Sequence, residues 1–186
     1  MAKILNSLFF SISPRTAGFS TVNICNFTPA SLVLTQVLMF IGGSPASTAG
    51  GLKTTTIFVL LIVLIKNANA RGDVVFCNKR VNQRAIHKAL KLLCLLLGLV
   101  IVSTISICAI ENLSADVVLF ETISAIATVG LSLSLTPLLG VFSKLILCVL
   151  MFAGRVGALT ITLAISGNDG SLEQEIEYPD SKIVVG

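Results

Sequence analysis

The sequence predicts an all-α integral membrane protein built from repeated units, each a short re-entrant helix, a polar turn and a broken transmembrane helix. Three observations support this prediction. First, 54% of the 186 residues are hydrophobic and 12% are charged, whereas a soluble domain is about one quarter charged. Second, the apolar residues form runs of helical length. Third, a Thr-x-Gly-apolar-Ser string occurs twice, each time after a short apolar stretch.

The first unit begins with the apolar run Ile4–Ile12, which is too short to span a bilayer and leads to "RTAGFSTV" at residues 15–22. A helix that enters the membrane and turns back fits this pattern. The next run, Ala30–Ile65, is apolar at both ends but small and polar over Gly42–Thr56. As one straight helix it would be about 54 Å long, well over the apolar thickness of a membrane. One crossing with an irregular middle is therefore expected, and such backbone must line a cavity or lie inside protein.

The second unit has the same order of features. Ala89–Ile110 is the clearest transmembrane helix, since it is long enough to span and almost free of charge. Val117–Ile126 is again short, and "ATVGLSLS" follows at residues 127–134. Leu138–Ser166 is a second long apolar run with Arg155 near its centre. A charge at that depth is a functional-site hypothesis by default.

An offset of 112 residues aligns the two units without a gap. The string "VLMF" at residues 37–40 recurs at 149–152, and Gly42 falls on Gly154. Many transporter folds are built from internal repeats, so the two turns are expected at equivalent places around a shared axis. The aligned turn residues are Thr16 with Thr128, Gly18 with Gly130, and Ser20 with Ser132.

The distribution of charge predicts the orientation in the membrane. Positively charged loops stay on the cytoplasmic side, and the loop between the units carries Lys66, Arg71, Lys79, Arg80, Arg84 and Lys88 against the single acid Asp73. The number of crossings then places the acidic tail on the same side. We expect a multi-pass protein of the plasma membrane, surrounded by lipid, with a cytoplasmic C-terminus.

The two turns predict a filter for a monovalent cation. A re-entrant helix followed by a Gly-containing turn presents backbone carbonyls to a dehydrated ion, and glycine tolerates the backbone conformations this requires. The alternative is a pair of ordinary turns at a membrane edge, but duplication in register favours a filter. The expected filter and cation-site residues are Thr16, Ala17, Gly18, Phe19, Thr128, Val129, Gly130 and Leu131.

The polar interruption and Arg155 are expected to form a gate below the filter. An arginine in mid-span needs acceptors, and the exposed carbonyls of Gly42–Thr56 are the expected partners, since Gly43 is the counterpart of Arg155 by the same offset. Alternatively, Arg155 snorkels or pairs with Glu121, and Lys53 lies near the cytoplasmic end of the cavity. The expected gate residues are Gly42, Gly43, Ser44, Ser47, Thr48, Gly50, Gly51, Lys53 and Arg155.

Other classes of function lack the residues they need. "GGSPASTAGG" lacks the spacing of a phosphate-binding loop. The number of cysteines, five, is odd, and no CxxC occurs. We therefore interpret them as unpaired residues that act as small apolar side chains. We find no carboxylate pair, no Ser/His/Asp set and no metal-ligand cluster in the sequence. We therefore predict no enzyme activity, no cofactor bound by this chain and no nucleic-acid partner.

The strings "SPRTAGFSTV", "LMFIGGSPASTAGGLKTTT", "ATVGLSLSLTP" and "MFAGRVGALT" resemble the Trk/Ktr/HKT family of potassium transporters, most closely the Ktr-type membrane subunit. The resemblance covers nearly the whole chain except the acidic tail. It implies four repeats around one pore, of which this chain would hold the C-terminal half. The implied divisions are 1–70, the third repeat without its first helix; 71–88, a basic cytoplasmic loop; 89–168, the fourth repeat; and 169–186, the acidic tail.

The resemblance also implies function. Potassium would be taken up through filter turns at Gly18 and Gly130, and the loop at residues 42–56 would face Arg155 as a gate. Sodium is a coupling ion in some members. The implied partners are a second copy in a homodimer and a cytoplasmic nucleotide-binding regulatory ring (KtrA-like).

Completeness is the main departure from the family pattern. Two filter turns cannot enclose an ion as four do, so the missing N-terminal half or a full-length homologous subunit is expected. The alternative is a non-conducting remnant that only associates with a full-length relative.

Overall fold

A computed structural model gives the fold and describes residues 2–44, 47, 49–65, 75–76 and 79–167. The expectation of an all-α protein is confirmed, apart from an antiparallel pair of two-residue strands, β1 (Val75–Phe76) and β2 (Lys79–Arg80). The predicted gate residue Thr48, the basic residues Lys66 and Arg71, and the acidic tail lie outside the described residues. The helices are α1 (Ala2–Ile12), the 3-10 helix η1 (Ile24–Asn26), α2 (Pro29–Phe40), α3 (Thr54–Ile65), α4 (Gln83–Glu111), α5 (Ala115–Ile126), the 3-10 helix η2 (Thr136–Leu138) and α6 (Val141–Gly167).

The 112-residue offset of the sequence reappears in the backbone. Pro29 begins α2 and Val141 begins α6, and η1 and η2 begin at residues 24 and 136. Between the short helices and these elements, left-handed backbone conformations recur at matching positions. They occur at Thr16 and Thr128, and again at Gly18 and Gly130. The chain therefore follows the same path in both units, from the end of the first helix (α1 or α5) to the start of the next (α2 or α6).

The units diverge after the shared "VLMF" string. In the first unit α2 ends at Phe40 and α3 begins at Thr54, and the described residues between them, 41–44, 47 and 49–53, are non-helical. This stretch, named the intramembrane loop below, corresponds to the interruption expected over 42–56, but the last three residues of that range belong to α3. In the second unit α6 continues to Gly167. The sequence difference explains the break, because "GGSP" follows in the first unit, and paired glycines and proline disfavour helix.

The long helix α4 is the clearest candidate for a membrane span. Within the described residues, Ala85–Glu111 is the helix long and apolar enough to cross a membrane, judged by length and composition. It begins before the expected Ala89, because Gln83–Lys88 continues the helix with polar residues that hydropathy does not detect. The apolar helices α2 and α3 are each shorter than a span.

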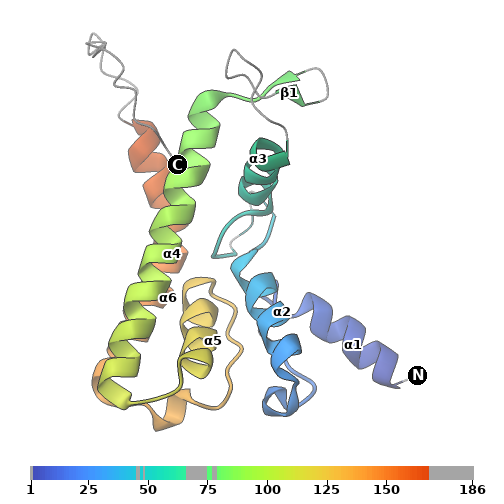
Figure 1. The fold of residues 1–186 in the computed structure, drawn as a ribbon, viewed down its shortest axis with the longest axis vertical. Coiled ribbons are helices and arrows are strands. Elements are labelled where there is room, and N and C mark those ends of the chain that lie inside the picture. The colour runs from blue at the N-terminus through green and yellow to red at the C-terminus, as the bar shows by residue number, and fades with distance from the viewer. Residues whose placement is uncertain (1, 45–46, 48, 66–74, 77–78, 168–186) are drawn as a thin grey trace.

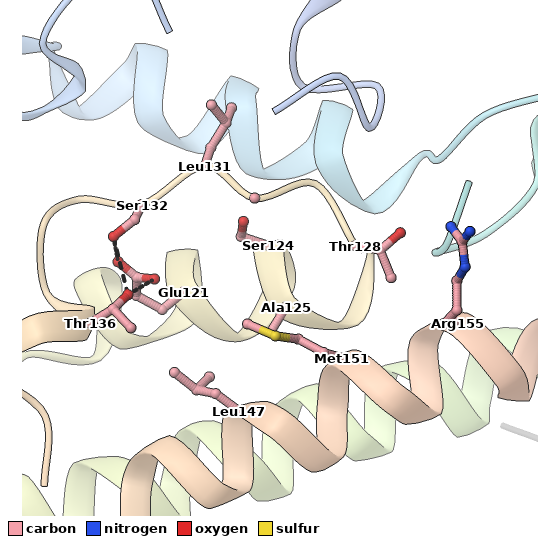
Figure 2. A pocket seen from close by; sticks show the side chains of 11 residues that line it. Glu121, Ser124, Ala125, Thr128, Leu131, Ser132, Thr136, Leu147, Met151 and Arg155 are labelled. Carbon is pink, nitrogen blue, oxygen red and sulfur yellow. Dashed lines mark hydrogen bonds between the residues drawn. The ribbon is translucent and has the colours of Figure 1, made fainter. Parts of the chain in front are cut away.

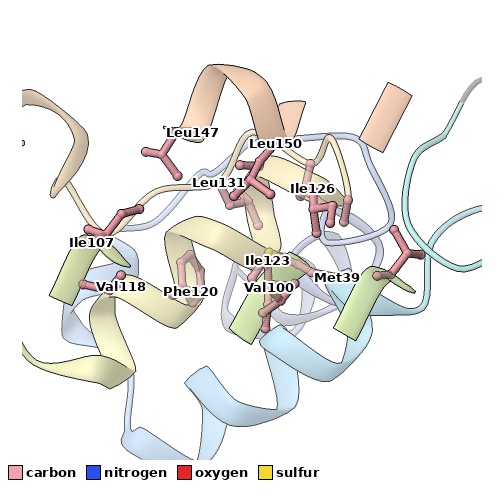
Figure 3. Packing of buried hydrophobic residues seen from close by; sticks show 14 of the residues in the cluster. Met39, Val100, Ile107, Val118, Phe120, Ile123, Ile126, Leu131, Leu147 and Leu150 are labelled. Atoms are coloured by element: carbon pink, nitrogen blue, oxygen red, sulfur yellow. The ribbon is translucent and has the colours of Figure 1, made fainter. Parts of the chain in front are cut away.

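The short helix α5 is the centre of the packing. It contacts α4, α6 and α2, and Figure 1 shows it beside the long pair of α4 and α6. Phe120 and Ile126 are fully buried, and Figure 3 shows side chains of all four helices around them. The Thr104 and Thr122 hydroxyls, 2.9 Å apart, join α4 to α5. In apolar surroundings, such interhelical hydrogen bonds help to fix how helices associate.

The counterpart helix α1 is exposed. Leu8 is 60% exposed, whereas Phe120, its counterpart by the offset, is fully buried. Figure 1 shows α1 directed away from α4. An edge-to-face contact between the rings of Phe10 and Phe27, with centroids 4.5 Å apart, holds α1 to the chain after η1. Nothing in the described chain covers α1 as α4 covers α5.

A glycine sets the distance between α5 and α6. A Cβ atom on Gly154 would lie 1.9 Å from the carbonyl oxygen of Ile126 at the end of α5, so only glycine fits. A Cβ on Gly98, in α4, would meet nothing within 4 Å. The two positions are both helical glycines and differ in their surroundings.

We predict that Gly154→Ala lowers the free energy of unfolding by about 1–3 kcal/mol, because the added methyl group overpacks the α5–α6 contact. Gly98→Ala, the matched control, should be neutral or stabilising by up to about 1 kcal/mol, since alanine is the better helix former. Thermal unfolding in detergent measures both. Equal midpoints for the two variants would contradict the assigned role of Gly154.

Candidate functional site

The two predicted filter turns meet in the structure. A Cβ atom on Gly18 would lie 2.2 Å from the carbonyl oxygen of Val129, and the Cα of Gly18 is 4.0 Å from the Cβ position of Gly130. These residues are over one hundred positions apart in the chain. Two backbones can approach this closely only where side chains are absent. The pair of glycines therefore marks the point at which the two units touch.

Both turns carry the same unusual backbone. Thr16 has φ 66° and Thr128 has φ 55°, although a left-handed conformation is a genuine outlier for a β-branched residue. Such a residue costs on the order of 1–3 kcal/mol and persists only where its surroundings impose it. The strain occurs at matching positions of both units. It therefore belongs to the turn itself and is not an accident of one loop.

The turns direct carbonyl groups away from the ends of the short helices. In the second turn the amides of Thr128 and Val129 donate to the carbonyls of Ala125 and Ser124 at 3.1 and 3.0 Å. The N–H and C=O groups of a trans peptide point in opposite directions. The carbonyls of Ala127 and Thr128 therefore face away from these helix residues. In the first turn the amides of residues 17 and 18 both donate to the carbonyl of Ser13, at 3.1 and 3.3 Å.

A buried carboxylate braces the second turn. Glu121 on α5 is 5% exposed, and its Oε1 accepts from the Ser132 hydroxyl at 2.5 Å and the Leu133 amide at 3.0 Å. Its Oε2 accepts from the Thr136 hydroxyl at 3.1 Å. Figure 2 shows these groups converging at one end of a cavity of about 410 Å³. These three hydrogen bonds hold the chain that follows the turn.

The first turn is braced differently. Phe9 is the counterpart of Glu121, and no carboxylate is present there. Instead, the buried Ser13 hydroxyl donates to the carbonyl of Phe19. The Phe19 side chain itself is 70% exposed. Neither Glu121 nor Ser13 was predicted to brace a turn, although an acid within an apolar helix was a signal that could have indicated such a role.

The intramembrane loop is closed at its base and held from within. The Leu52 amide donates to the Phe40 carbonyl, and the Thr54 amide donates to the Gly43 carbonyl, both at 3.2 Å. The Lys53 ammonium donates to the carbonyls of Ser47 and Ala49 at 2.8 and 2.7 Å. Lys53 therefore satisfies loop carbonyls of the kind that were predicted as acceptors for Arg155.

Arg155 reaches toward the loop from α6. Figure 2 shows its guanidinium at the opposite end of the cavity from Glu121, pointing toward the intramembrane loop. It also lies within electrostatic range of Lys53. The pairing of Arg155 with this loop as a gate stays a prediction, and the Glu121 carboxylate accepts from Ser132, Leu133 and Thr136. The side chains of Arg155 and Lys53 thus lie near Thr128 of the second turn.

The loop contacts the second turn directly. The Gly50 amide donates to the Thr128 hydroxyl at 3.0 Å. A Cβ atom on Gly50 would lie 2.7 Å from that hydroxyl oxygen and 2.9 Å from the Ala127 carbonyl oxygen. A Cβ on Gly42 would likewise lie 2.1 Å from the carbonyl oxygen of Gly50. The glycines at 42 and 50 are therefore required by close backbone contacts, which links the predicted gate to the predicted filter.

The site offers neutral oxygen atoms and two nearby cations. Among the described residues, no cluster of His, Cys, Asp or Glu is placed to hold a metal ion. Carbonyl and hydroxyl oxygens suit a monovalent ion that must bind and then leave. The structure brings together Thr128, Val129 and Gly130 with Gly18, the loop and Arg155.

Nearly the whole chain is similar to bacterial potassium-uptake proteins. A family model described as TrkH, cation transport protein, matches residues 1–174. The chain is 35% identical over 188 residues to the potassium/sodium uptake protein NtpJ of Enterococcus hirae, covering 99% of this chain and 42% of that protein. It is 35% identical over 184 residues to the Ktr system potassium uptake protein B of Bacillus subtilis, covering 99% and 41%. The Ktr system potassium uptake protein D of that organism is 32% identical over 180 residues, covering 97% and 40%.

The chain therefore spans about two fifths of the length of these curated relatives. The matched region includes both turns, the intramembrane loop and α6 up to its end.

We predict that Glu121→Ala lowers the free energy of unfolding by about 1–3 kcal/mol, because the partly buried donors of Ser132, Leu133 and Thr136 all lose the same acceptor group. Glu121→Gln keeps one acceptor oxygen and should cost less. Glu111→Ala is the comparison, since the half-buried Glu111 accepts from two donors, the Gly140 amide and the Ser143 hydroxyl at 2.7 and 2.6 Å, and Glu121 from three. Thermal unfolding of the three variants in detergent tests this order, and a larger loss for Glu111→Ala would contradict it.

The two filter glycines should respond unequally to alanine. Gly130→Ala adds a side chain at φ 89°, where its Cβ meets only the Gly18 Cα at an ordinary contact distance of 4.0 Å, and should cost about 1–2 kcal/mol for the left-handed conformation alone. Gly18→Ala adds the same strain and also a collision with the Val129 carbonyl, so its unfolding midpoint in detergent should fall further. Equal losses would mean that the two turns do not touch as described.

Proposed function

Because the chain belongs to the TrkH family of cation transport proteins, we propose that it is the C-terminal half of a subunit that carries potassium ions across the plasma membrane. The resemblance inferred from the motifs is confirmed by this membership. The family is one of membrane transporters and not of enzymes. The observation that carries the proposal is the meeting of two matching turns at Gly18 and Gly130.

The chemistry of the turns supports a potassium filter. Their carbonyls, together with the hydroxyls of Thr16 and Thr128, provide neutral oxygen ligands that can replace the hydration shell of a monovalent ion. The names of relatives refer to potassium uptake and, for NtpJ, to potassium and sodium. Potassium is accordingly the proposed substrate, with sodium as a coupling ion. The strained threonines are consistent with a turn whose conformation is imposed by function.

A groove on the first unit supports the proposal of a half-pore. A cavity of about 650 Å³ lies between α1, η1 and α2, with Asn6 and Phe10 among its lining residues. Their counterparts Val118 and Thr122 are fully buried, and Thr122 is bonded to α4. The groove is thus the place in which a helix equivalent to α4 would lie. We propose that a transmembrane helix of the remaining half occupies it, and that this half supplies two further filter turns.

The intramembrane loop is the proposed gate. It lies against the inner end of the second turn. The positive charges of Lys53 and Arg155 would repel a cation there. Short helices α1 and α5 are proposed to be re-entrant, with the basic loop and the C-terminus in the cytoplasm. A second copy in a homodimer and a cytoplasmic nucleotide-binding ring are the proposed partners.

Growth of a bacterial strain without its own potassium-uptake systems tests the proposal. The chain is expressed alone and beside a second polypeptide that supplies the first half, with Gly130→Ser as the matched variant. We expect growth at limiting potassium from the pair, and loss of growth in the variant. Growth from the chain alone would contradict the half-pore. No growth from either, with protein present in the membrane, would favour the alternative of a non-conducting remnant that binds a full-length relative through the α1 groove.

A further inference from the structure

We infer that the Thr128 hydroxyl couples the intramembrane loop to the occupancy of the filter. The Gly50 amide and a cation at the inner end of the second turn compete for this one oxygen atom. Docking of the loop and binding of the inner ion therefore oppose one another. This inference rests on the proposed function for the identity of the ion.

The contact that carries the inference is specific. The Gly50 amide donates to the Thr128 hydroxyl at 3.0 Å, and the missing side chain of Gly50 allows the backbones to approach this closely. Gly51 follows with φ 70°, and a Cβ there would lie 3.3 Å from the Ala127 Cβ. Two successive glycines therefore seat the loop on the inner end of the turn.

The loop is built to hold the Gly50 amide in this place. The Lys53 ammonium binds the carbonyl of Ala49, the residue before Gly50, and that of Ser47. The Ser47 hydroxyl accepts from the Ala49 amide at 3.2 Å. The backbone that leads into Gly50 is thus fixed by two side chains. The backbone that carries the Thr128 hydroxyl is held at φ 55°.

The competition follows from elementary electrostatics. A hydroxyl oxygen has two lone pairs, but a cation on one of them would lie close to the amide hydrogen on the other. Both are positive, and their repulsion is strong where water is excluded. Arg155, which lines the same cavity as Thr128, and Lys53, which is bonded to the carbonyl before Gly50, add to this repulsion. A bound cation therefore weakens the hydrogen bond, and by reciprocity the docked loop weakens binding of the cation.

The coupling is expected at one turn of the two. Thr16 occupies the matching position of the first turn with a matching φ, but the Gly50 amide bonds to Thr128. This difference gives a matched pair of variants. Thr128→Val removes the hydroxyl at the loop contact, and Thr16→Val removes the equivalent hydroxyl of the other turn. Thr128→Ser keeps the hydroxyl and shows whether the fold tolerates change at this position.

Hydrogen–deuterium exchange of the peptide that contains the Gly50 amide tests the inference. The full chain is embedded in lipid nanodiscs, alone and with the first-half polypeptide, in potassium chloride or in choline chloride at equal ionic strength. In choline we expect slow exchange for the unaltered protein, Thr128→Ser and Thr16→Val, and exchange about fivefold faster or more for Thr128→Val. Potassium should accelerate exchange by a similar factor in the unaltered protein and leave Thr128→Val unchanged. Peptides of α4 report whether each variant is folded.

Three results would overturn the inference. The first is that the Gly50 amide exchanges at the same rate in Thr128→Val and in the unaltered protein. The second is that Thr16→Val accelerates this exchange as much as Thr128→Val does. The third is that potassium does not change the exchange rate in the assembly that restores growth. The last result would leave the proposed function intact. Conversely, a potassium response that depends on Thr128 in an assembly without transport would support the coupling while the proposed function fails.

Discussion

Burial of the short helix α5 is the constraint on which the rest of the structure depends. Its contacts with α4, α6 and α2 enclose nearly every side chain in its second half. Gly154 lets α6 approach the last carbonyl of α5 so closely that no other residue fits. The end of this helix is therefore held in one position. The second turn begins there. The position of the helix end therefore determines where the turn places its carbonyls, its strained threonine and its contact with Gly18.

Polar side chains form hydrogen bonds with the non-helical backbone, which lies against the apolar helices. Non-helical chain at membrane depth is tolerated only where its N–H and C=O groups find partners in protein or water. Glu121 provides acceptors for the chain after the second turn, and Lys53 provides donors for the intramembrane loop. Each of these two side chains satisfies several groups at once. Glu121 and Lys53 therefore act on the structure of the turn and of the loop, and the proposed filter and gate depend on these contacts.

The two units of the repeat share a backbone conformation but differ in the side chains that hold their turns in place. Both units place a left-handed threonine and glycine after a short helix, yet the first turn is braced by Ser13 and the second by Glu121. The long helix breaks in the first unit and continues in the second. A loop from one unit can thus rest on the turn of the other.

Much of the fold could be predicted from local patterns in the sequence. The apolar runs indicated the helices, the break after "VLMF" followed from glycine and proline, and the 112-residue offset aligned the turns, because each depends on neighbours along the chain. The start of α4 was missed, since Gln83–Lys88 is helical through propensity and not through hydropathy. The tertiary structure alone decided which groups meet. Gly18 lies against the Val129 carbonyl, and the Gly50 amide donates to the Thr128 hydroxyl. The Lys53 ammonium donates to two loop carbonyls. Most of these partners are distant in sequence, and all depend on close packing distances. Residue types determine what a segment can form, whereas the close packing of helices determines what it touches.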